Sequence, residues 1–195
     1  MKTKVSNLLA LVFALLVSCQ TSQSELEIDI LNDILPELLS EYSDIAPLKY
    51  SHGARTLFIY DSFTSALADS SIKDLYSRTM NTGDFQMFFE VDTIWRPLVM
   101  KLTTDDSAPK SFEPSELNQI KEYEIVNASK AVRLQKQSTI GVSRFSHIFF
   151  SENKTRACFY YSFLCNSECG EGYIVFAEKV GKGWKIAQAT NLWVS

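Results

Sequence analysis

The sequence has only two histidines, and it lacks the short motifs that usually identify an enzyme. It contains no glycine-rich phosphate loop, dinucleotide-binding fingerprint, HExxH helix or GxSxG elbow. A zinc site would need four ligands, and no second cysteine pair or histidine pair occurs at suitable spacing. The sequence therefore indicates neither a metal nor another cofactor, and it does not identify an enzyme.

The chain also has no excess of basic residues and no internal repeat. It carries 19 lysines and arginines against 23 acidic residues, a formal net charge of -4. Binding to a nucleic-acid backbone normally requires a clear basic excess, so we expect no nucleic-acid partner. The 195 residues are 46% hydrophobic, which is enough for the core of one compact domain.

A transmembrane helix is not indicated at the N-terminus, although the first residues are apolar. Lys2 and Lys4 precede an uncharged run from Leu8 to Val17, which is too short to cross a hydrocarbon core of about 30 Å. A basic start, a short apolar run and a small residue are typical of an export signal. A plain secretory signal followed by an incidental cysteine remains an alternative to the more specific interpretation given next.

The end of this segment, Leu16-Val17-Ser18-Cys19, resembles the lipobox of bacterial lipoproteins. The resemblance implies cleavage before Cys19 and attachment of a diacylglycerol group to its sulfur, so that the lipid holds the protein to a membrane. Gln20 stands where an aspartate would resemble an inner-membrane retention signal. We therefore expect a lipid-anchored protein of the bacterial cell envelope, on the outer membrane, facing either the periplasm or the cell surface.

Three segments follow from this interpretation. Residues 1–18 are the signal peptide, residues 19–24 are the lipidated cysteine and a short polar tether, and residues 25–195 are one α+β domain. Removal of Lys2 and Lys4 with the signal changes the formal net charge from -4 to -6. Such a charge does not favour attraction to an anionic membrane surface, so attachment is expected to come from the lipid alone.

Helices are expected in the first part of the domain. Leucines and isoleucines from Leu26 to Leu39 recur at helical spacing, with Ser24 as a candidate cap and a kink or break near Pro36. The other expected elements are a strand at 56–60, a helix at 65–78, an ambiguous apolar segment at 85–102, a surface loop at 105–114 and a short helix at 115–122.

The last part of the chain predicts a sheet. Short polar or glycine-containing links separate four apolar runs, as in an antiparallel meander. The runs are 141–150, 155–164, 172–180 and 184–194. The expected fold is α+β, with the N-terminal helices packed on a four-stranded antiparallel meander. This order is weakly similar to the NTF2-like and cystatin-like superfamilies, which is an analogy of fold and gives no function.

The same stretch resembles an uncharacterised bacterial lipoprotein family over roughly its last 55 residues. The resemblance carries no activity. It rests on Ser143-Arg144-Phe145, Asn153-Lys154-Thr155-Arg156-Ala157, the segment from Cys165 to Cys169-Gly170-Glu171-Gly172-Tyr173, Lys179, and Gly183-Trp184-Lys185-Ile186. The sequence departs from that pattern at Ser146-His147, where a second apolar residue is more usual.

Three cysteines remain after lipidation of Cys19, namely Cys158, Cys165 and Cys169. Export favours a disulfide, and Cys165 and Cys169 lie close enough in an expected hairpin loop to form one. Reduced or differently paired cysteines, involving Cys158, are the first alternative. Redox or metal chemistry is the second, although a thioredoxin-like dithiol would have shorter spacing and a following helix.

His147, Cys158 and Tyr160 are the residues that we expect at a pocket between the sheet and the helices. Cys158 as nucleophile and His147 as base would also need an orienting group and an oxyanion hole, and the sequence signals neither. We interpret the protein as a non-catalytic binding or envelope-accessory module, with an envelope protein or a small apolar ligand as its partner. The alternatives are a thiol-dependent hydrolase or redox enzyme and a structural interaction protein.

Overall fold

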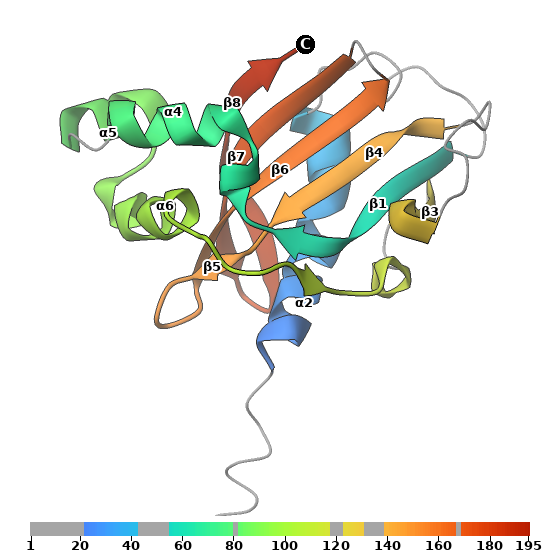
Figure 1. Ribbon diagram of the computed structural model, residues 1–195. Helices are drawn as coiled ribbons and strands as arrows, with labels where there is room; N and C mark the ends of the chain where they lie inside the picture. Colours follow the sequence, from blue (N-terminus) through green and yellow to red (C-terminus); the bar gives the residue numbers. More distant parts are fainter. Residues whose placement is uncertain (1–21, 43–54, 80–81, 118–122, 131–138, 167–168) are drawn as a thin grey trace, which may run out of the picture.

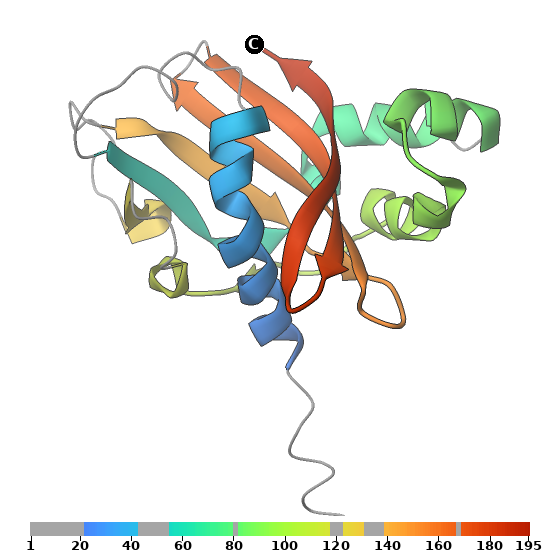
Figure 2. The ribbon, with the colours of Figure 1, turned by 180° about the vertical axis from the view of Figure 1, so that it is seen from behind.

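The computed structural model describes residues 22–42, 55–79, 82–117, 123–130, 139–166 and 169–195. These residues form an α+β domain in which helices lie on both faces of one large sheet (Figures 1 and 2). The α+β fold class is thereby confirmed. The expected signal peptide, Cys19 and the first tether residues lie outside the described residues. No helix in the described part of the chain is long and apolar enough to span a membrane.

The sheet has eight strands rather than the four that we expected. Its order is β2-β1-β4-β6-β7-β8, with β3 beside β1 and β5 beside β6. The strands are β1 (Arg55–Thr64), β2 (Lys110–Ser111), β3 (Tyr123–Asn127), β4 (Thr139–Ser146), β5 (Phe149–Phe150), β6 (Arg156–Asn166), β7 (Cys169–Val180) and β8 (Gly183–Val194).

The expected antiparallel meander is present as β4, β6, β7 and β8, and it forms half of the larger sheet. The other half of the sheet was not expected, and it is built around β1. Strand β1 pairs in parallel with β4 on one side and also pairs in parallel with β3. Leu57, Phe58 and Ile59 of β1 are all buried, as expected for a strand inside a sheet with both faces covered. Parallel strands need long connections between them. Short hairpin links, from which we predicted the meander, therefore give no indication of this half of the sheet.

The first helix of the described residues, α2 (Gln23–Glu37), begins two residues before the expected position. Ser22, not Ser24, caps it, through a reciprocal capping box with Glu25. Pro36 lies inside α2, and the next residues form a π-helical turn, η1 (Leu38–Tyr42), so the helix changes its winding instead of breaking. Because proline lacks an amide hydrogen and crowds the preceding turn, a wider turn at this point relieves the conflict.

The ambiguous segment 85–102 is helical. Pro97 lies in the first turn of its helix, where a missing amide hydrogen breaks no helical bond. The expected helix at 65–78 is divided in two, and only the start of the expected helix at 115–122 is described. The elements are η2 (Ala66–Ala68), α4 (Ser70–Thr79), α5 (Thr82–Phe89), η3 (Thr93–Trp95), α6 (Arg96–Thr103), η4 (Pro114–Glu116) and η5 (Ala128–Lys130).

Two separate cores lie on the two faces of the sheet. Helix α2 crosses one face, and α4, α5 and α6 cover part of the other (Figures 1 and 2). Strand β6 serves both cores by alternation: Phe159 and Tyr161 pack towards α2, whereas Cys158 and Tyr160 pack towards the three later helices. The helices therefore cover both faces, and the sheet is the middle layer.

Candidate functional site

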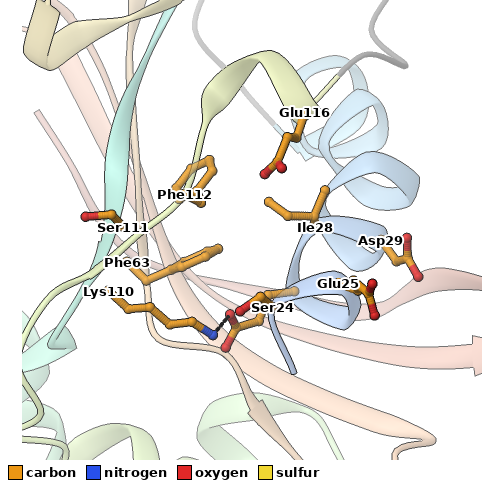
Figure 3. Close-up of a pocket in the computed structure, with 10 residues that line it drawn as sticks. Ser24, Glu25, Ile28, Asp29, Phe63, Lys110, Ser111, Phe112 and Glu116 are labelled. Atoms are coloured by element: carbon orange, nitrogen blue, oxygen red, sulfur yellow. Dashed lines mark hydrogen bonds and ion pairs between the residues drawn. The ribbon is translucent and has the colours of Figure 1, made fainter. Parts of the chain in front are cut away.

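The start of α2, the end of β1, strand β2 and η4 enclose a groove of about 370 Å³ (Figure 3). We call it the ion-pair groove. Its lining includes Glu27, Ile28, Phe63, Lys110, Phe112 and Glu116. The Asn32 side-chain amide donates to the Glu116 carbonyl oxygen at 3.1 Å and so ties η4 to α2. The groove is thus built between elements that are fixed to one another.

The ion-pair groove has an aromatic wall. Phe63 is 1% exposed and stacks on Phe112, with ring centroids 4.6 Å apart. Ile28 of α2 approaches the same pair from the opposite side (Figure 3). The pairing of β1 with β2 brings the two rings together. Phe63 of β1 lies opposite Lys110 of β2, and Phe112 follows Lys110 by two residues. Phe112 and Ile28, which are partly exposed, therefore offer an apolar surface to a ligand, and the buried Phe63 supports that surface from behind.

A partly buried ion pair closes the inner end of the groove. Lys110 Nζ lies 2.5 Å from Glu27 Oε2, and the Glu27 side chain is only 2% exposed. The Gln23 side-chain amide donates to Glu27 Oε1 at 3.2 Å. Because both oxygens of Glu27 are engaged, its buried charge is compensated. A ligand in the groove would therefore meet this neutralised pair and an aromatic surface, together with the carboxylates of Glu25, Asp29 and Glu116.

Sequence reasoning missed this groove. It assigned Lys110 and Phe112 to the surface loop at 105–114 and did not single out Glu27. One signal was available: Glu27 lies on the same helical face as Ile30, Leu31 and Ile34, which are completely buried. A carboxylate on a buried face requires a cation or several donors, so its position predicts a partner without identifying it.

The expected disulfide between Cys165 and Cys169 is confirmed. The two Cα atoms lie 5.4 Å apart, within the usual range for a disulfide, and the bond closes the turn between β6 and β7. Cys158 is a free and completely buried cysteine. The disulfide thus restrains a hairpin and leaves Cys158 outside the pairing.

His147 has an orienting carboxylate that the sequence did not reveal. Its Nδ1 lies 2.6 Å from Asp105 Oδ2, and the two side chains are 12% and 3% exposed. The expectation that Asp105 is solvated in a surface loop was wrong. Burial would raise the pKa of Asp105, but hydrogen bonds from His147 and Ser107 outweigh it and hold that pKa below its usual value. This pair joins the loop after α6 to the link between β4 and β5.

Cys158 is a poor candidate for a nucleophile. Its side chain lies in the core beneath α4, α5 and α6, and burial raises the pKa of its thiol far above the ordinary value. Only the thiolate is strongly nucleophilic, so a thiol held neutral in an apolar core is inert. In the part of the chain that the structure describes, no hydrogen bond links Cys158 to His147, whose partner is Asp105.

Tyr160 belongs to a hydrogen-bonded network at a second, smaller cavity of about 110 Å³. Its hydroxyl donates to Asp69 at 2.5 Å and accepts from the Trp193 indole at 2.8 Å. Burial and the neighbouring carboxylate raise the pKa of Tyr160. Of the three residues expected at a pocket, Tyr160 lines this cavity, whereas His147 and Cys158 do not.

Among the described residues, no group of three or more histidine, cysteine or acidic side chains is arranged to hold a metal ion. Comparison of the chain with protein-family models, curated proteins and solved structures found no match. The resemblance of the C-terminal stretch to a lipoprotein family therefore stays a prediction. The cavities of the domain and the residues that line them are the features that bear on its function.

Proposed function

We propose that this chain is a lipid-anchored protein of the bacterial outer membrane whose domain binds a small apolar molecule in the ion-pair groove. The observation that carries the binding proposal is the stacked pair of Phe63 and Phe112 in a groove of about 370 Å³. Ligand sites of small molecules typically have volumes of roughly 300 to 1,000 Å³ and mostly apolar linings with a few polar groups. The Lys110–Glu27 pair supplies such polar groups at one end.

The position of the groove supports the link between anchor and ligand. Cys19 precedes Ser22, the cap of α2, by three residues, and Ser24 and Glu25 already line the groove. An extended chain spans about 3.5 Å per residue, so the proposed lipid lies within roughly 10 Å of the start of α2. An apolar molecule leaving the membrane then reaches the groove over a short path.

Replacing Cys19 with alanine tests the anchor. The substitution removes the sulfur that would carry the lipid, so we expect most of the protein to move from the membrane fraction to the soluble fraction. The measurement is fractionation of the expressing cells, followed by mass determination of the purified protein. Replacing Ser24 with alanine is the matched control, because it changes a residue close to Cys19, at the start of α2, but leaves the cysteine. Unchanged membrane retention of the Cys19→Ala protein would rule the anchor out.

Phe112→Ala tests the ligand site. We expect it to weaken binding of the neutral fluorescent probe N-phenyl-1-naphthylamine about tenfold, because one face of the aromatic wall is lost. Phe88→Ala is the control, since Phe88 is 42% exposed on α5 and does not line the groove. Phe112→Leu, which keeps an apolar side chain, should have an intermediate effect. Equal probe affinity in the Phe112→Ala and Phe88→Ala proteins would exclude this groove as the apolar site.

A further inference from the structure

A second groove, of about 280 Å³, lies beside the start of α2 and differs from the first in charge. We call it the lysine groove. Its lining includes Leu26, Lys101, Ile148, Phe149, Phe150 and Lys154, and no carboxylate. Lys101 comes from the last turn of α6, and Lys154 from the turn between β5 and β6. Two lysines from separate elements therefore line one groove with four apolar side chains, which we call its apolar base.

The two lysines are free to meet an external anion. Both are exposed, and among the described residues no carboxylate forms an ion pair with either of them. Two carboxylates elsewhere at this end of the domain have partners, because Glu178 lies 3.6 Å from Arg156 and Asp33 accepts the Trp184 amide at 2.8 Å. The exposed Glu152, in the same turn as Lys154, does not line the groove. The local charge at the groove is positive, although the whole chain is acidic.

The lysine groove also lies at the end of the domain from which the anchor would extend. Figures 1 and 2 show the start of α2 at the same end as the β5–β6 turn and the β7–β8 turn. The three residue steps from Cys19 to Ser22 allow a separation of only about 10 Å, similar to the Debye length at physiological ionic strength. At that distance, local charge governs the interaction with a membrane more than net charge does.

We infer that the lysine groove binds the phosphate headgroup of an anionic phospholipid in the bilayer that carries the anchor. Lys101 and Lys154 pair with the phosphate, and the apolar base contacts the glycerol and the first methylenes of the lipid. The contact holds the domain in one orientation on the membrane, with the start of α2 towards the lipid. This inference rests on the proposed lipidation of Cys19, and it differs from the expectation that the lipid alone provides attachment.

The test uses the full lipidated protein in vesicles of phosphatidylcholine, with or without phosphatidylglycerol. Hydrogen exchange of the amides in 148–154 and 99–103 should slow more than about tenfold with phosphatidylglycerol, because each lysine near an anionic surface contributes about fivefold. The double substitution Lys101→Gln and Lys154→Gln should abolish the slowing. Lys130→Gln with Arg144→Gln is the control of equal charge, since neither residue lines the groove or belongs to the turns at this end of the domain.

The outcomes separate the two proposals. A protein that fails to float with pure phosphatidylcholine vesicles lacks the anchor, which overturns this inference together with the proposed anchoring. A protein that floats but shows equal exchange in both lipids keeps its anchor and overturns the headgroup site alone. Slowing that persists in the groove variant, or that inorganic phosphate produces without phosphatidylglycerol, also overturns the assignment to a lipid headgroup.

Discussion

Replacing Gly172 with alanine is expected to lower the free energy of unfolding by about 3 kcal/mol, because the space for a methyl group is already filled. A Cβ atom at this position would lie 2.2 Å from Trp193 Nε1 and 2.6 Å from the Tyr160 hydroxyl oxygen. These atoms are hydrogen-bonded to each other, and the same hydroxyl donates to Asp69. The added methyl group therefore disrupts a connected network rather than one adaptable side chain.

Urea unfolding followed by tryptophan fluorescence measures this effect. Gly83→Ala is the matched control, because no atom lies within 4 Å of a Cβ built at Gly83 in α5. That change should raise the free energy of unfolding by up to about 1 kcal/mol, as alanine is the better helix former. Our account of the packing is wrong if the Gly172→Ala protein unfolds at the same urea concentration as the parent.

The packing around Gly172 also gives a physical reason for the Cys-Gly-x-Gly-Tyr pattern. A Cβ at Gly170 would lie 3.1 Å from the Trp193 ring, so both glycines meet that indole on one face of the sheet. Glu171 is fully buried, and Tyr173 lies in the core beneath α2 on the opposite face. The expected strand began at Gly172 and left Gly170 in the loop before it, whereas both glycines lie within strand β7, where they allow the close approach of Trp193.

Local patterns predicted the features that depend on near neighbours. Alternation and short links were enough to find the meander of β4, β6, β7 and β8, and a separation of four residues was enough to propose the bridge between Cys165 and Cys169. The place of β1 could not be predicted in this way, because its partners β3 and β4 follow it by long connections.

The polar contacts of the candidate sites could not be predicted from local patterns either. Lys110 and Glu27 are 83 residues apart in the chain, and His147 and Asp105 are 42 apart. No periodicity relates residues at such separations, so the sequence marks at most one member of each pair as unusual. Glu27 is unusual because it lies on a buried helical face, and His147 is unusual because it lies between two phenylalanines. Their partners, Lys110 and Asp105, are identified only by the folded structure.

Replacing Glu171 with glutamine is expected to raise the free energy of unfolding by about 2 kcal/mol at neutral pH. Glu171 is completely buried beneath α2, and its Oε2 accepts the Tyr173 hydroxyl at 3.0 Å. Its Oε1 is buried with no hydrogen-bond partner, and no lysine or arginine of the described residues pairs with it. Glutamine keeps an oxygen for Tyr173 and replaces the buried charge with a neutral amide, whose unpaired N–H groups cost less free energy to bury than the charge does.

Glu178→Gln is the control, because it makes the same change of charge at a side chain that is 46% exposed and 3.6 Å from Arg156. Exposed ion pairs contribute little, so that variant should stay within about 0.5 kcal/mol of the parent. Urea unfolding of both variants gives the comparison, and a loss of stability in the Glu171→Gln protein would contradict the argument. A higher free energy of unfolding in the Glu171→Gln protein would mean that Glu171 destabilises the native fold. That result is expected of a residue retained for function rather than for stability.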